Sequence, residues 1–101
     1  MAGKVFLSEY SLNTVRGVQI LKAPPLRVQT PITSSGAAQQ FTPFLGHTEA
    51  IRIAVDGGGP VCIQFGTAPN ATTNDERWAA NQTEHRAVAP GDTISIISSP
   101  T

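Results

Sequence analysis

EAIRIAVDGGGPVCIQFG, residues 49–66, is the stretch of sequence that decides the fold. Ile51, Ile53 and Val55 occupy every second position, so they share one face of a strand. The segment 61–66 has the same period, with its apolar residues again on one side. Between the two, DGGGP is typical of a turn, because glycine accepts backbone angles that other residues avoid. We therefore predict two strands joined as a β-hairpin.

Further strands are predicted toward the C-terminus. TISIIS at 93–98 alternates well and is expected to be the last strand. APGD at 89–92 precedes it as a tight turn, with Pro90 preset for the first central position. Shorter strands are predicted at 84–88 and near 77–80, separated from the first pair by a polar loop at 67–75.

The first third of the chain is less regular. Strands are predicted at 4–8, at 18–21, at 26–30 as an edge strand, and at 37–41. The APPL segment between them is expected to be extended, since each proline restricts itself and the residue before it.

These elements predict an all-β protein: a single β-sandwich or jelly-roll-like domain of seven to nine short antiparallel strands. Residues 36–101 are predicted to form the sandwich core. Residues 1–35 are interpreted as edge segments and an extended N-terminal arm, which lies over the sandwich or over a neighbouring subunit. The alternative for 1–35 is an ordinary edge strand with loops, within one domain overall.

Composition excludes several classes of protein. The chain has 101 residues with seven basic and seven acidic side chains, so its net charge is zero and one domain is expected. Neutrality argues against nucleic-acid binding, which needs a basic surface. The apolar runs are too short to span a bilayer, and Glu9 interrupts the only one near the N-terminus, so neither a membrane partner nor a signal peptide is predicted. Only 14% of residues are charged, and such a surface associates easily.

The candidate catalytic groups are few. Cys62 lies in the middle of a predicted strand and is interpreted as structural. His47 and His85 lack metal-ligand spacing and are interpreted as surface residues. Asp75 and Glu76 are adjacent, so in a strand they would point to opposite faces and share no substrate. The sequence therefore predicts neither an enzyme nor a bound cofactor or metal.

Trp78 is the only tryptophan. If exposed, it could stack on a sugar or anchor an interface, and if buried it would cap the core. A core or interface role is preferred to sugar binding, because one aromatic side chain does not make a binding platform.

Several segments resemble the small virion structural proteins of tailed bacteriophages and prophages. They are CIQFGTAPNATT at 62–73, RWAANQTE at 77–84, VAPGD at 88–92 with the apolar strand that follows, VFLSEY at 5–10, GVQ at 17–19, and APPL at 23–26. The resemblance covers nearly the whole chain and is weakest at 33–48.

This resemblance implies a capsid decoration, or cement, protein. Such a protein would be assembled in the bacterial host cytoplasm, dock on the outer surface of the virion head and bridge copies of the major capsid protein against the pressure of packaged DNA. It is also expected to be a homo-oligomer, either a dimer or a trimer. The candidate capsid or oligomer interface consists of Val18, Ile20, Pro24, Pro25, Leu26 and Trp78. Deleting residues 1–26 is expected to abolish capsid binding while the sandwich still folds.

Two alternatives remain open. The first is a carbohydrate-binding or receptor-binding module of a tail or head fibre, which predicts an exposed Trp78 beside the loop at 67–76. The second is a head–tail joining or tail-tube component, which predicts rings of subunits.

Overall fold

The computed structural model describes residues 2–100, apart from the side chains of Val15 and Gln19. These residues form nine β-strands and no helix, which confirms the all-β prediction. The strands are β1 (Lys4–Val15), β2 (Val18–Val28), β3 (Ile32–Thr33), β4 (Gln39–Gln40), β5 (Ala50–Val55), β6 (Val61–Gly66), β7 (Glu76–Trp78), β8 (Thr83–Ala87) and β9 (Thr93–Ser98).

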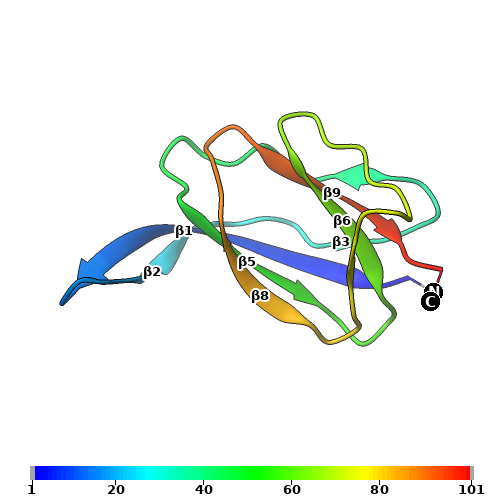
Figure 1. Cartoon of the computed structure of the whole chain (residues 1–101), viewed down its shortest axis with the longest axis horizontal. Helices are drawn as coiled ribbons and strands as arrows, with labels where there is room; N and C mark the ends of the chain where they lie inside the picture. The colour runs from blue at the N-terminus through cyan, green and yellow to red at the C-terminus, as the bar shows by residue number, and fades with distance from the viewer. Residues whose placement is uncertain (1, 101) are drawn as a thin grey trace.

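Two antiparallel sheets pack face to face as a β-sandwich (Figure 1). One sheet has the order β2-β1-β5-β8, with the short β3 also paired to β1, and the other has the order β4-β9-β6-β7. The predicted hairpin of β5 and β6 is wrong, because these strands belong to different sheets. Each is instead flanked by strands distant in sequence, β5 by β1 and β8 and β6 by β7 and β9.

The glycine run at 57–59 makes a corner between the sheets rather than a hairpin turn. A Cβ atom on Gly58 would lie 2.5 Å from the carbonyl oxygen of Ala2, so only glycine fits there. Asp56 fixes the same corner, since its Oδ1 accepts hydrogen bonds of 2.9 Å from the N–H groups of Lys4 and Gly58. The corner therefore holds the start of β1 against the β5–β6 connection.

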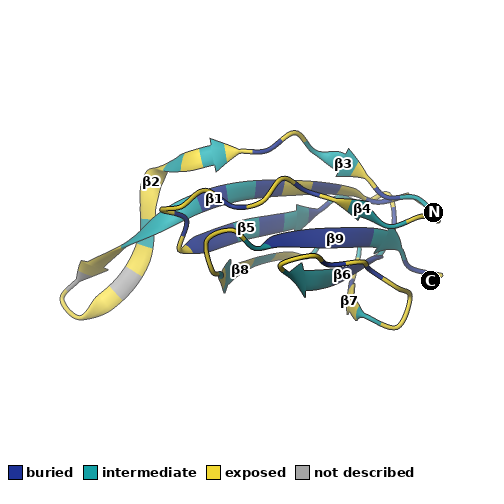
Figure 2. Ribbon diagram, turned by 90° about the horizontal axis from the view of Figure 1, so that it is seen from above, coloured by how far each residue is buried: buried dark blue, intermediate teal, exposed yellow. Residues whose placement is uncertain are grey.

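The core lies between the sheets and is made of their alternating inward residues. Val5, Leu7, Ile51, Ile53 and Val55 come from one sheet, while Val61, Ile63, Trp78, Ile94 and Ile96 come from the other. Phe41 and Phe44, from the segment between β4 and β5, complete it. In Figure 2 a continuous buried stretch runs along the first four residues of β9.

The boundary predicted at residue 35 does not divide the fold. β1 lies between β2 and β5, and Val5 and Leu7 on it are fully buried. Residues 4–10 therefore form part of the sandwich. Against the expectation that the sandwich folds without residues 1–26, their removal would take Val5 and Leu7 out of the core. What projects is narrower than the predicted arm: the distal part of the β1–β2 hairpin, residues 11–22, extends past the end of β5 (Figure 1).

Candidate docking surface

The projecting hairpin is held straight by its turn and by its base. Val15 pairs with Val18, so Arg16 and Gly17 form a two-residue turn, and both have positive φ, at 52° and 80°. This is the type I′ geometry, whose twist matches that of paired strands. From the end of the β5 pairing at Tyr10, the five remaining residues of β1 extend about 17 Å at roughly 3.3 Å per residue.

The base of the hairpin is tied to the body by Glu49. Glu49 Oε1 accepts a hydrogen bond of 3.0 Å from the N–H of Leu12, and the N–H of Glu49 donates to the carbonyl oxygen of Tyr10 at 2.9 Å. The inner edge of the hairpin is therefore capped near the body. No strand pairs with the outer edge of β2 within residues 2–100, which makes β2 an edge strand.

Exposed apolar side chains are concentrated on β2. Six large apolar side chains are exposed among those that the structure describes, and four of them, Val18, Ile20, Leu26 and Val28, lie on this strand. Val18 is 62% exposed and Val28 64%. Exposed apolar residues that gather on one element mark an interaction surface, whereas single ones need no explanation. In Figure 2 the distal hairpin is mostly exposed, in contrast with the buried body.

The two prolines of β2 separate the distal hairpin from the part of β2 beside the body. Pro24 is exposed and Pro25 is half-buried. Neither has an N–H to offer, so this stretch of the edge cannot accept a further strand along its full length. A partner can therefore contact Pro24 and Pro25 through their side chains and carbonyl oxygens but not through a backbone N–H.

A buried carboxylate joins the base of β2 to the loop before β5. Glu9 is fully buried and has four hydrogen-bond donors around it. Its Oε1 accepts from the N–H of Leu45 and from Thr48 Oγ1, both at 2.8 Å. Its Oε2 accepts from Arg27 Nε and, at 3.0 Å, from Gln29 Nε2. Because both β2 and the 42–48 loop supply donors, Glu9 fixes one against the other.

The hydrogen bonds of Glu9 make the fold sensitive to acid. Burial raises the pKa of the Glu9 carboxyl, but the donors from Leu45, Arg27, Thr48 and Gln29 outweigh it, so the pKa lies below its ordinary value of 4.5. The pKa of Glu76 is also lowered, chiefly by its hydrogen bond from Arg86. A lowered folded-state pKa gives stability that is present above the unfolded-state value and is lost as the pH falls through the folded-state value.

We therefore expect the free energy of unfolding to be nearly constant between about pH 7 and pH 5 and to decline below about pH 4.5. Urea unfolding at a series of pH values measures this. The slope below pH 4.5 is expected to be smaller in Glu9→Gln. An equal slope in that variant would show that other carboxyl groups cause the acid sensitivity.

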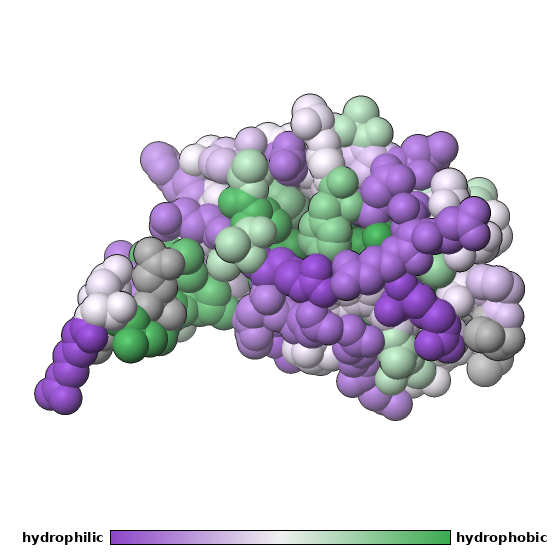
Figure 3. All heavy atoms as spheres, in the orientation of Figure 1, coloured by the Kyte–Doolittle hydropathy of each residue, from purple (hydrophilic) through white to green (hydrophobic). Residues whose placement is uncertain are grey.

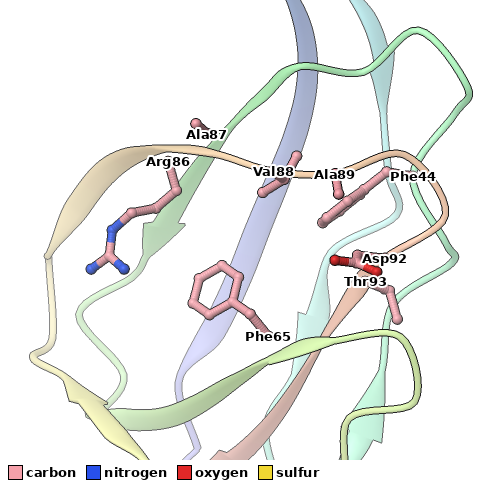
Figure 4. Close-up of a pocket in the computed structure, with 8 residues that line it drawn as sticks. All are labelled: Phe44, Phe65, Arg86, Ala87, Val88, Ala89, Asp92 and Thr93. Carbon is pink, nitrogen blue, oxygen red and sulfur yellow. The ribbon is translucent and has the colours of Figure 1, made fainter.

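A groove opens where the two sheets separate. Phe44, Phe65 and Val88 line it together with Arg86, Ala87, Ala89, Asp92 and Thr93, and its volume is about 420 Å³ (Figure 4). Phe65 and Val88 are only partly buried against the core, so the groove is an exposed extension of it. Figure 3 shows hydrophobic side chains at the bottom of a hollow in this face of the body, surrounded by hydrophilic ones.

Arg86 closes the sandwich edge next to this groove. Its guanidinium lies 4.9 Å from the Trp78 ring and 5.7 Å from the Phe65 ring. It also pairs with Glu84 at 2.8 Å and with Glu76 at 2.9 Å. These contacts link β8 of one sheet to β6 and β7 of the other.

We expect Arg86→Met to lower the free energy of unfolding by about 1–2 kcal/mol, since partly exposed ion pairs and cation–π contacts each contribute about 0.5–1 kcal/mol. Arg77→Met is the matched control, because Arg77 is an exposed arginine on β7. Its effect is expected to stay within about 0.5 kcal/mol. Equal effects of the two changes in urea unfolding would contradict this role for Arg86.

Trp78 belongs to the core. It is 0% exposed, and its β-strand pairs with β6 at the Val61 position. Its assignment to the candidate interface is therefore wrong, and the core alternative is right. A sugar cannot stack on the indole, because both faces are covered, one of them by the Arg86 guanidinium.

The other candidate groups do not converge. Cys62 is buried, as predicted, and its Sγ lies 3.7 Å from the carbonyl oxygen of Thr73. His47 and His85 are both exposed, as predicted. Asp75 accepts a hydrogen bond of 2.7 Å from the N–H of Thr72, whereas Glu76 pairs with Arg86. Among residues 2–100 no three His, Cys, Asp or Glu side chains lie close enough to hold a metal ion.

Sequence reasoning missed Glu9, Arg16 and the groove residues. Glu9 follows Val5 and Leu7 at every second position, and this period was the one signal that placed it on the inner face. The groove has no such signal, because its lining comes from four separate segments.

Comparison with known proteins gives no relative for this chain. No family model, curated protein or solved structure matches it. Within residues 2–100 no helix is long and apolar enough to cross a membrane.

Proposed function

We propose that this protein is a capsid decoration protein of a tailed bacteriophage or prophage, which docks on the outer head lattice and bridges copies of the major capsid protein. The observation that carries the proposal is the exposure of two large apolar side chains, Leu26 and Val28, on the part of the edge strand β2 beside the body. The sequence resemblance at 62–73 and 77–84 supplies the class of partner.

The surface proposed to meet the capsid is the part of β2 beside the body. Pro24, Pro25, Leu26 and Val28 lie there, on a strand held by the Glu9 hydrogen bonds. A rigid surface loses little conformational entropy when it binds. A contact of about 1,600 Å² in total is sufficient for a stable complex, and the symmetry of the shell repeats it many times.

Counting copies in purified virions tests the proposal. Hundreds of copies of this chain on the outer surface of each head, seen by cryo-electron microscopy and quantified by mass spectrometry, are expected. Its presence in lysate but absence from finished particles would reject it.

The docking surface is tested by replacing Leu26 and Val28 together with serine. Both side chains are more than one-third exposed, so the change removes apolar contact area from the surface without opening the core. Capsid affinity is expected to fall at least about tenfold, since burying such side chains contributes about 1–2 kcal/mol each. The matched control replaces Thr83 and His85 with serine, both exposed residues on the opposite edge strand of the same sheet and outside the groove lining. Equal occupancy of both variants on heads would reject this surface.

Two other functions make different predictions. The carbohydrate-binding alternative depended on an exposed Trp78, and burial of that side chain counts against it. A head–tail joining component would be present at about a dozen copies per particle, at one vertex, in a closed ring. The copy number therefore separates it from a decoration protein.

A further inference from the structure

The distal hairpin and the groove have complementary surfaces. Residues 11–22 include Arg16 and Lys22 and no acidic residue, so the hairpin has a charge of +2. Val18 and Ile20 next to these cations are largely exposed. The hairpin is therefore both apolar and cationic.

The groove is apolar, with one guanidinium and one carboxylate at its edge. Phe44, Phe65 and Val88 form its apolar lining, and Asp92 and Arg86 stand at its edge (Figure 4). Arg86 is already paired with both Glu76 and Glu84. Asp92 is therefore the carboxylate of the groove lining that has no cationic partner within residues 2–100.

Arg16 occupies a backbone position that suits other residues better. Its φ of 52° lies in the left-handed region, where asparagine and glycine are favoured at the first central position of a type I′ turn. A side chain with a Cβ atom, such as arginine, is disfavoured there for steric reasons. The fold places a cation at the tip of the hairpin in spite of this cost, which indicates a role for the side chain outside the turn.

We propose that the hairpin of one copy of this protein seats in the groove of a second copy. Val18 and Ile20 then cover the apolar lining, and the Arg16 guanidinium meets the Asp92 carboxylate. Ile20 lies toward the base of the hairpin and lines a shallow hollow with Ala50 and Ala87 of its own body. The tip of the hairpin points away from that body, so Arg16 and Val18 cannot reach their own groove (Figure 1). A second copy of the chain matches the groove in polarity and in charge, because its hairpin brings exposed apolar side chains and the Arg16 cation. Every copy in solution has both the hairpin and the groove.

This contact joins two different surfaces, so it closes either as a reciprocal two-fold dimer or as a ring. The inference concerns the isolated chain and does not rest on the proposed function. Failure of self-association would leave capsid docking through Leu26 and Val28 untouched.

Sedimentation velocity on the purified chain, from about 5 μM to about 500 μM, is the test. Arg16→Asp and Asp92→Arg are each expected to weaken self-association at least about tenfold, and the double variant is expected to recover most of the loss. Recovery requires the two side chains to meet, since two independent defects would add. Far-UV circular dichroism and thermal melting establish that each variant is folded.

Arg16→Asn separates the turn from the contact. It is expected to raise the melting temperature, because asparagine suits the turn, and at the same time to weaken self-association. If Arg16 acted only within the turn, the substitution would change the melting temperature and leave self-association unchanged.

Cysteine pairing gives a second measurement. A mixture of Val18→Cys and Ala89→Cys proteins is expected to form a disulfide between copies under mild oxidation, since Ala89 lines the groove and Cys62 is only 1% exposed. Thr30→Cys replaces Val18→Cys as the control, because Thr30 is exposed outside the hairpin. The proposal is overturned if the protein stays monomeric throughout the concentration range, or if the single charge reversals leave its association unchanged.

Discussion

Glu9→Gln is expected to lower the free energy of unfolding by about 3–5 kcal/mol, the usual effect of removing one partner of a buried ion pair. Glutamine has nearly the same shape, so packing is conserved. Its amide nitrogen would, however, replace one of the two carboxylate oxygens and cannot accept a hydrogen bond. That nitrogen would face either Leu45 and Thr48 or Arg27 and Gln29, which donate to Glu9 in the native protein. The Thr48 hydroxyl can also accept, but the Leu45 N–H on one side, or Arg27 and Gln29 on the other, would lose their acceptor.

Urea unfolding at neutral pH measures the effect of Glu9→Gln. Glu49→Gln is the matched control, because Glu49 is exposed and a glutamine can still accept the hydrogen bond from Leu12. Its cost is expected to be below about 1 kcal/mol. Similar losses in the two variants would mean that the donors around Glu9 find other partners, and the proposed rigidity of the β2 edge would lose its basis.

Deletion of residues 2–26 is expected to abolish cooperative unfolding altogether. The deletion removes Val5 and Leu7 from the core and leaves β5 without its β1 partner. Loss of each buried side chain of this size costs about 2–5 kcal/mol, and the total stability of a small domain is about 5–15 kcal/mol. Circular dichroism and a thermal melt measure the result.

A shorter hairpin provides the matched control for that deletion. Ser11 pairs directly with Lys22, just as Val15 pairs with Val18. The two pairs are four residues apart on each strand, so they have the same hydrogen-bonding pattern. Replacing residues 12–21 by Asn-Gly therefore closes the strands with the same type of turn. This variant is expected to keep a cooperative transition and to lose self-association. Its failure to fold would show that the hairpin is part of the core assembly and not a projecting element.

Strand positions were predictable because alternation is local. β5, β6 and β9 present an apolar residue at every second position, and the predicted segments 61–66 and 93–98 coincide with β6 and β9. The exposed Val18, Ile20 and Leu26 were also identified, because residues 1–35 show little of the strong alternation of a core and contain an extended proline-rich segment. Their position on a projecting hairpin was not, since Arg16-Gly17 is an unusual turn pair.

The sequence by itself determined that this chain is all β, which residues of β5, β6 and β9 share an apolar face, and that its surface has few charges. Only the tertiary structure decided which strands are neighbours: the glycine run that reads as a hairpin turn is a corner between sheets, where Gly58 meets Ala2. It also decided that Glu9 and Trp78 are buried and that a groove lies beside Arg86. The physical reason is that alternation records only which face of a strand is apolar. Sheet order, by contrast, depends on contacts between segments far apart in the chain.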